Sequence, residues 1–277
     1  MKMLAKEKAA AMGPSYSMNA SLTIMLAFGA LIGIVYMLAQ ANEGFLYLLS
    51  NGLPPLLAFG AFGTACAGLI RNGVSLKNRI SIVWLSYSLG MLLWFLGEST
   101  WAVYALWYSV PTPFPSVADV FWLAGYAPLI VAMVFQAWPF RDFFATKRML
   151  GVVSLILVVA GMLLLVLLPS AYASEIGQDL ASVLVGLAYP LLDVVLLIVA
   201  LPVLFLFGRG TFWRPFLFIT VGLILTFLGD TLFSWATTAG VYYDGSYLEL
   251  FFHWGYLALV YGFYLRLRTG TGPRMLE

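Results

Sequence analysis

Charged side chains are scarce in this sequence. Only 9% of the 277 residues are Asp, Glu, Lys or Arg, and 62% are hydrophobic, whereas soluble globular domains carry about 25% charged residues. So few charges cannot cover the surface of a soluble domain of this length. We therefore expect lipid to surround most of the chain and predict a multi-pass protein of the cell membrane.

Cysteine and histidine are almost absent. Cys66, the single cysteine, cannot form a disulfide within the chain and is predicted to be a small core residue. One histidine, His253, cannot supply a HExxH or three-histidine zinc site or a bis-histidine haem site. Phosphate-binding glycine motifs, paired prenyl-transferase acids and an intramembrane lysine for retinal are also missing. The sequence identifies no cofactor and no metal, and it disfavours an enzyme.

Long apolar runs are what the sequence has in abundance. Runs of about 18 residues or more match the ~30 Å hydrocarbon layer at about 1.5 Å per helical residue, and they lack the alternation of β-barrel strands. The first run is too long for the hydrophobic core (h-region) of a typical signal peptide and is predicted to be a retained helix. We therefore predict an all-α bundle of about eight transmembrane helices, at residues 20–40, 46–70, 80–108, 116–139, 149–169, 180–207, 213–238 and 247–265.

The positions of the basic residues predict the topology. Within a few residues of the predicted boundaries, all fourteen lie before the first predicted helix or after the second, fourth, sixth or eighth, and the alternate connections contain none. Because Lys and Arg concentrate in cytoplasmic connections, both termini are predicted to be cytoplasmic. This distribution gives no support to nucleic-acid binding. The residues are Lys2, Lys6, Lys8, Arg71, Lys77, Arg79, Arg141, Lys147, Arg148, Arg209, Arg214, Arg266, Arg268 and Arg274.

Short sequences recur along the chain at an offset of about 130 residues. Residues 96–99 (LGES) are echoed at 228–231 (LGDT), and 116–126 are echoed at 246–256 through Ser, an acid, Phe and Gly-Tyr. We predict two four-helix repeats of the same orientation, related by an axis along the membrane normal. The predicted organisation is a cytoplasmic segment at 1–19, repeats at 20–141 and 149–268, and a cytoplasmic tail at 269–277.

Ionisable residues within the predicted helices are candidate functional residues, because they are costly at membrane depth. Glu98 and Asp230 occupy the outer half of the third and seventh helices, and Asp193 lies near mid-membrane, three residues after Pro190. Proline removes a backbone donor and frees carbonyl groups that can bind a cation. The predicted ligand-binding residues are Glu98, Asp193, Asp230, His253, Tyr189 and Tyr256.

Two further acids have a predicted structural role. Ser116-x-x-Asp119 and Ser246-x-x-Glu249 both match the capping box, in which serine and acid satisfy free N–H groups at a helix start. We predict that these four residues cap helices or form the rim of the ligand site.

The segments PSVADVFWLAGY at 115–126, AYPLLD at 188–193 and LGD at 228–230 resemble a known family. They resemble the multi-helix membrane sensory domains that precede diguanylate cyclase, phosphodiesterase or kinase modules in microbial proteins, over residues 80–265. The resemblance implies a membrane-embedded input domain with Asp119, Asp193 and Asp230 at the matched positions. No output module follows Arg268, so a free-standing receptor or partner subunit is expected.

Together these features predict a sensory or ligand-binding module with an outward-facing cavity lined by acids and aromatic residues. A secondary transporter or proton-coupled carrier is the main alternative, and a lipid-modifying enzyme is a third. The expected partners are membrane lipids and a cytoplasmic or membrane signalling protein, and the sequence leaves a homo-oligomer open.

Overall fold

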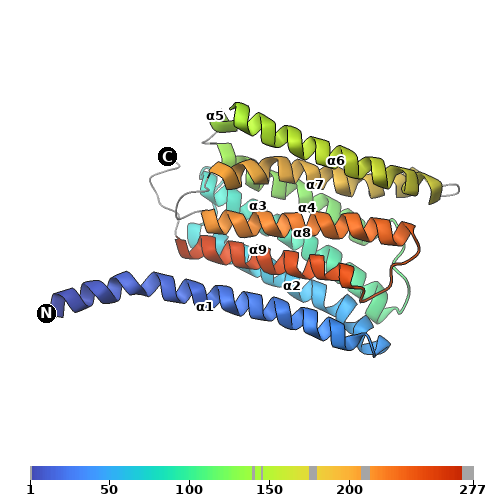
Figure 1. Cartoon of the computed structure of the whole chain (residues 1–277), viewed down its shortest axis with the longest axis horizontal. Coiled ribbons are helices and arrows are strands. Elements are labelled where there is room, and N and C mark those ends of the chain that lie inside the picture. Colours follow the sequence, from blue (N-terminus) through green and yellow to red (C-terminus); the bar gives the residue numbers. More distant parts are fainter. Residues whose placement is uncertain (1, 139–140, 145, 175–179, 207–212, 270–277) are drawn as a thin grey trace.

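The structure is a computed structural model that describes residues 2–138, 141–144, 146–174, 180–206 and 213–269, and it is all-α, as predicted (Figure 1). Nearly all of the predicted 269–277 tail lies outside the described residues. A π-helical turn, η1 (Val103–Trp107), follows the third helix, and a 3-10 turn, η3 (Tyr247–Glu249), precedes the last. The described helices are α1 (Lys2–Ala39), α2 (Glu43–Asn72), α3 (Arg79–Ala102), α4 (Val117–Ala137), the short α5 (Arg141–Phe144), α6 (Lys147–Ser174), α7 (Leu180–Leu206), α8 (Trp213–Thr238) and α9 (Leu250–Thr269).

Six of these helices are long and apolar enough to cross a membrane, so the chain is a multi-pass helical membrane protein. The other two predicted spans are not among these six. In α6, the residues with described side chains form a shorter apolar helix, Met149–Val159, and most of the rest of the predicted span lies outside them. In α9, polar residues such as His253 and Arg266 lower the hydropathy of the helix. Their side chains are buried against neighbouring helices. The six spans are Ala20–Ala39, Glu43–Asn72, Arg79–Trp107, Val117–Ala137, Leu180–Leu204 and Trp213–Thr238.

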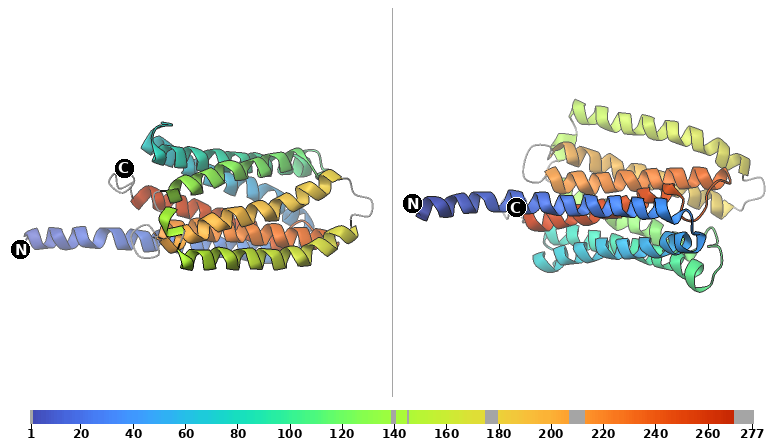
Figure 2. Two further views of the ribbon diagram at one scale, coloured as in Figure 1. Left: turned by 90° about the horizontal axis from the view of Figure 1, so that it is seen from above. Right: turned by 60° about the horizontal axis from the view of Figure 1, so that its bottom comes forward.

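The helices form one bundle in which α9 lies between α1, α2 and α8 (Figures 1 and 2). Helix α3 packs between α2 and α4, and α7 packs against α4, α6 and α8. Helices α1 and α6 lie at opposite edges in Figure 1. Helix α1 begins at Lys2 rather than near residue 20 as predicted, and its N-terminal part extends beyond the bundle. The Ala-, Lys- and Met-rich sequence before residue 13 has high helix propensity, which explains the earlier start.

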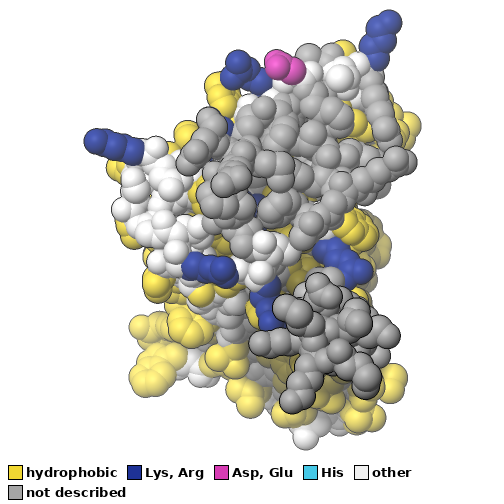
Figure 3. Space-filling model, turned by 90° about the vertical axis from the view of Figure 1, so that its left-hand side faces the viewer, with side chains coloured by type: hydrophobic (Ala, Val, Ile, Leu, Met, Phe, Trp, Pro, Cys, Tyr) yellow, Lys and Arg dark blue, Asp and Glu magenta, His cyan; other side chains and the backbone are white. Residues whose placement is uncertain are grey.

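Basic side chains gather at one end of the bundle, which we call the basic end (Figure 3). Helices α2 and α9 end there, and α3, α6 and α8 begin there. The described basic residues at these helix ends are Arg71, Lys77, Arg79, Arg141, Lys147, Arg214, Arg266 and Arg268. Arg209 and Arg274, which were part of the topology prediction, lie outside the described residues.

Two glycines allow pairs of helices to approach closely. A Cβ atom added to Gly90 on α3 would lie 3.2 Å from the backbone oxygen of Gly125 on α4. A Cβ atom added to Gly222 on α8 would lie 2.9 Å from the backbone oxygen of Gly255 on α9. Small residues at helix interfaces are the usual means of close packing in membranes. The tight pairs α3–α4 and α8–α9 therefore depend on these glycines.

Replacing Gly222 by alanine should destabilise the protein by about 1–2 kcal/mol, because the added methyl group forces α8 away from the backbone of α9. Unfolding of the purified protein in mild detergent, followed by circular dichroism, measures this loss. Gly63→Ala is a matched control, because a Cβ at this position on α2 meets nothing within 4 Å. Equal stability of the two variants would contradict the packing argument.

Candidate functional site

Five helices bring three acids and two tyrosines together, and we call this group the acid–tyrosine cluster. It consists of Glu98 on α3, Tyr126 on α4, Asp193 on α7, Asp230 on α8 and Tyr256 on α9. Asp193, Tyr126 and Tyr256 are buried, and the two other acids are partly buried. No described Lys or Arg forms an ion pair or hydrogen bond with the cluster. Its negative charge can therefore be removed only by protons or balanced by cations, and the tyrosine hydroxyls stabilise whatever charge remains.

One hydroxyl group serves two carboxyl groups in this cluster. The Tyr126 hydroxyl lies 2.8 Å from Oδ1 of Asp193 and 3.2 Å from Oδ2 of Asp230. The hydroxyl carries a single proton, and the second oxygen of Asp193, Oδ2, has no hydrogen-bond partner among the described residues. Two carboxylates cannot both be satisfied by one donor. A proton shared between Asp193 and Asp230 would supply the missing donor.

The second tyrosine, Tyr256, bonds to an acid of the first predicted repeat, just as Tyr126 bonds to acids of the second. The Tyr256 hydroxyl donates to Oε1 of Glu98 over 2.7 Å. Tyr126 on α4 thus reaches the acid of α8, and Tyr256 on α9 reaches the acid of α3. The Trp94 ring lies between the two tyrosines, with ring centroids 5.6 Å from Tyr126 and 6.2 Å from Tyr256. The two bonds tie together helices from both predicted repeats.

Tyr189, also predicted as a ligand residue, bonds to an acid beside this cluster. Its hydroxyl donates to Oδ1 of Asp119 over 2.8 Å. The other oxygen of Asp119 accepts from the backbone N–H of Ser116 over 2.7 Å, and the Ser116 side chain accepts a backbone N–H in return, forming the capping box at the start of α4. Asp119 therefore has a structural task at one oxygen and joins α4 to α7 at the other.

The second predicted capping box is not formed. Ser246 makes no side-chain cap, and its Oγ atom has no partner among the described residues. Glu249 instead accepts the backbone N–H of Gly245 over 2.7 Å. The reason is local: a 3-10 turn, η3, separates Ser246 from the α-helical part, so the first N–H groups point elsewhere than in an α-helical first turn.

Glu249 is the centre of a second group, the Glu249 cluster. Its Oε1 accepts from Ser50 on α2 over 2.8 Å and from Tyr242 over 2.9 Å, as well as from Gly245, and its Oε2 accepts from Tyr36 on α1 over 3.0 Å. Four donors on three parts of the chain thus converge on one buried carboxyl group. The cluster fastens α1, α2 and the loop before α9 to one another.

His253 belongs to the Glu249 cluster and not with the acids predicted to share its cavity. Its Nδ1 lies 2.6 Å from the backbone oxygen of Glu249, and its Nε2 lies 3.1 Å from the Tyr36 hydroxyl. Both ring nitrogens are therefore engaged. No group of three or more His, Cys, Asp or Glu side chains that could hold a metal ion occurs among the described residues.

Sequence reasoning missed three tyrosines of these clusters, namely Tyr36, Tyr126 and Tyr242. A signal for Tyr126 was available, because it is the repeat counterpart of the predicted Tyr256 at an offset of 130. No comparable signal marks Tyr36 or Tyr242, which reach Glu249 from a separate helix and from a loop.

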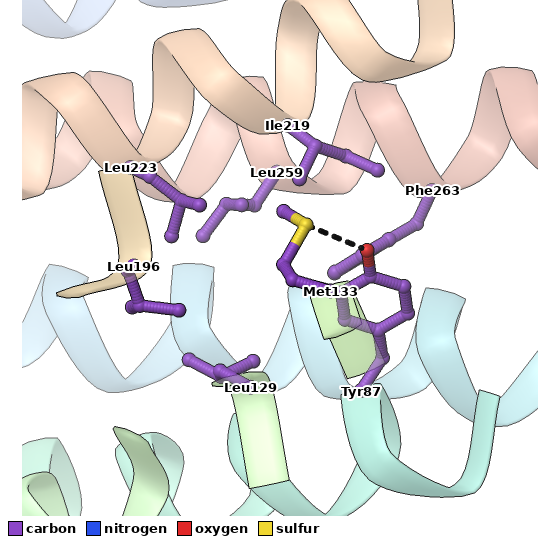
Figure 4. A pocket seen from close by; sticks show the side chains of 8 residues that line it. All are labelled: Tyr87, Leu129, Met133, Leu196, Ile219, Leu223, Leu259 and Phe263. Atoms are coloured by element: carbon purple, nitrogen blue, oxygen red, sulfur yellow. Dashed lines mark hydrogen bonds between the residues drawn. The ribbon is translucent and has the colours of Figure 1, made fainter. Parts of the chain in front are cut away.

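A small cavity lies closer to the basic end, between α3, α4, α7, α8 and α9 (Figure 4). Its volume of about 10 Å³ is that of roughly one water molecule, and its lining is apolar apart from the Tyr87 hydroxyl, which faces the sulfur of Met133 over 3.5 Å. None of the predicted ligand residues lines it. The lining residues are Tyr87, Leu129, Met133, Leu196, Ile219, Leu223, Leu259 and Phe263.

Comparison with known proteins adds no identification. No protein-family model matches the chain, and no curated protein or solved structure matches it.

Proposed function

We propose that this chain is a membrane-embedded sensory or ligand-binding module whose ligand is a proton or a small cation held by the acid–tyrosine cluster. The observation that carries the proposal is the single Tyr126 hydroxyl placed between the carboxyl groups of Asp193 and Asp230. A positive ligand at this point completes the hydrogen bonding, and its loss leaves two acids in contact. Occupancy of the site thereby changes the electrostatic repulsion between Asp193 on α7 and Asp230 on α8.

The proposal includes eight transmembrane helices arranged as two four-helix repeats with both termini in the cytoplasm. Several observations support it. The close contact of Gly90 with Gly125 recurs between Gly222 and Gly255. Helices α1 and α6, the first helices of the two predicted repeats, lie at opposite edges in Figure 1. Helix α1 begins at the end of the bundle at which α9 finishes. Concentration of basic side chains at that end favours its cytoplasmic location.

Proton occupancy can be tested by infrared spectroscopy of the purified protein. We expect C=O absorption from a buried protonated carboxyl group, and we expect Asp193→Asn and Asp230→Asn each to remove it, because the amide supplies the missing donor. Glu43→Gln, which changes an exposed acid at the start of α2, is the matched control. A sodium or potassium titration against choline chloride distinguishes the ligands, since a bound cation displaces the proton. A spectrum unchanged in both variants and by both cations would refute the proposal.

A proton-coupled carrier is the second candidate, favoured by two features of the same site. Pro190 lies inside α7 one turn before Asp193, and the crossed tyrosine bonds lie between the two predicted repeats. Transporter sites commonly occur at such positions. Proteoliposomes with an imposed pH gradient separate the two functions, because a carrier produces flux that Asp193→Asn abolishes, whereas a sensor does not. The third alternative, a lipid-modifying enzyme, gains no support from the engaged ring of His253.

The sensory form of the proposal also requires a signalling partner at the membrane. The resemblance of residues 80–265 to microbial input domains supports a cytoplasmic or membrane-bound output protein as that partner. Membrane lipids cover the apolar outer surface, on which many large side chains such as Leu56, Val120 and Leu184 are exposed.

A further inference from the structure

Three buried side chains near the basic end have N–H groups without acceptors. Nε1 of Trp84, Nε2 of Gln136 and Nε of Arg266 form no hydrogen bond within the described part of the chain. The side chains are only 0%, 4% and 7% exposed, so bulk water does not reach them. Buried donors are nearly always satisfied in folded proteins. A group of three therefore indicates an acceptor that binds from outside the chain.

Arg266 has the arrangement of an anion-binding arginine. Its guanidinium carbon, Cζ, lies 5.6 Å from the centre of the Trp84 ring and 5.3 Å from that of Phe216. No acid in the described residues pairs with it. Aromatic rings over a guanidinium group hold it by cation–π contact and leave its N–H edge free. That edge carries parallel donors that match the oxygens of a phosphate or carboxylate group.

Tyr87 contacts two of the three side chains, Trp84 and Gln136, and Arg266 contacts Trp84 in turn. Its ring lies 6.3 Å from the Trp84 ring, and its hydroxyl lies 3.5 Å from Oε1 of Gln136. The surrounding surface is also positive, because basic side chains surround this end of the bundle (Figure 3). One of them, Arg71 on α2, donates to the backbone oxygen of Leu267, the residue after Arg266. Negative ligands are attracted to such a face, and positive ligands are repelled.

We propose that Trp84, Gln136 and Arg266 form a binding site for a phosphate-type oxyanion at the basic end of the bundle. The phosphate belongs either to a free phosphate or phosphomonoester in the adjoining aqueous phase or to the headgroup of an anionic lipid. Phosphate supplies several acceptor oxygens and a negative charge to pair with the buried guanidinium group of Arg266. The site is separate from the acid–tyrosine cluster and does not depend on the function proposed for that cluster.

The test measures the unfolding temperature of the full chain in neutral detergent. One arm adds inorganic phosphate, another adds short-chain phosphatidylglycerol, and chloride and short-chain phosphatidylcholine at matched concentrations are the controls. Trp84→Phe keeps an aromatic ring beside Arg266 but removes the N–H donor together with the five-membered part of the indole, and Arg266→Lys keeps the charge and removes the planar edge. Lys77→Gln removes an exposed charge at the same end and is the matched control.

We expect phosphate or phosphatidylglycerol to raise the unfolding temperature of the wild type and of Lys77→Gln. Trp84→Phe and Arg266→Lys should weaken the apparent affinity about tenfold, the usual effect of losing one bond to a charged group. Stabilisation by both additives identifies the phosphate group itself as the ligand, and stabilisation by the lipid alone identifies a headgroup. If Arg266→Lys does not fold, Gln136→Leu replaces it. Equal stabilisation by chloride, or an affinity unchanged in the variants, would overturn the proposal.

Discussion

Replacing Glu249 by alanine is expected to destabilise the protein by about 3–5 kcal/mol, the largest effect we predict for a single substitution. The alanine leaves the hydroxyls of Ser50 and Tyr242 and the backbone N–H of Gly245 without their acceptor, and the Tyr36 hydroxyl keeps only Nε2 of His253. Each unsatisfied buried donor costs about 1–3 kcal/mol before relaxation. Reversible unfolding of the purified protein in mixed detergent measures the loss.

Glu43→Ala is the control for the Glu249 variant, because it removes an exposed acid at the start of α2 and should cost less than about 1 kcal/mol. Glu249→Gln should fall between the two, since its amide oxygen still accepts from some of the donors. A loss from Glu249→Ala no greater than that from Glu43→Ala would mean that the Glu249 cluster contributes nothing to stability.

The Glu249 cluster also explains how α1 remains attached to the bundle. Below the cluster, the indole N–H of Trp254 on α9 donates to the backbone oxygen of Gly29 over 3.0 Å. At the other end of the contact, the Gln40 amide donates to the backbone oxygen of Gly245 over 3.0 Å. Residues 20–39 of α1 are exposed on most of their surface, and in lipid hydrophobic burial gives little attraction between helices. Hydrogen bonds to α9 and to the loop before it therefore largely determine where α1 packs against the bundle.

The helices could be predicted from sequence because their cause is local. Apolar runs of sufficient length require helices in lipid, and the predicted segments 180–207 and 213–238 differ from α7 and α8 by no more than one residue at either end. The capping box at Ser116 and Asp119 could be predicted for the same reason, since its partners are three residues apart. The early start of α1 was missed because the predicted boundary marked the edge of the apolar run, whereas the helix follows propensity.

The clusters could be predicted only in part because their contacts are distant in sequence. The Tyr126–Asp230 and Tyr256–Glu98 bonds join residues 104 and 158 positions apart. Hydropathy marks an intramembrane acid as unusual but does not identify the helix that it faces. Arg266 shows the opposite error, because as a basic residue at a helix end it was interpreted only as a topology marker, although its side chain is buried.

Replacing Tyr126 by phenylalanine is the second substitution from which we expect a large effect, about 2–3 kcal/mol of lost stability. The change keeps the aromatic ring and deletes only its hydroxyl group. That hydroxyl is the only donor shared by Asp193 and Asp230 in the described structure. Tyr256→Phe, which deletes one bond to Glu98, should cost less, about 1–1.5 kcal/mol. Detergent unfolding curves of the two variants provide the comparison.

The partners of the two tyrosines can be established by double-mutant cycles. If the bonds cross between the two halves as in the structure, Tyr126→Phe should couple to Asp230→Asn by about 1 kcal/mol or more. Tyr256→Phe should couple to Glu98→Gln in the same way, whereas Tyr256→Phe and Asp193→Asn should be nearly additive. Coupling of each tyrosine to the acid of its own half, Tyr126 to Glu98 and Tyr256 to Asp230, would exclude the crossed arrangement. Among the described residues, the crossed bonds are the polar links between α3 and α9 and between α4 and α8. The same result would therefore also remove the route by which the proposed ligand at Asp193 and Asp230 could shift one half against the other.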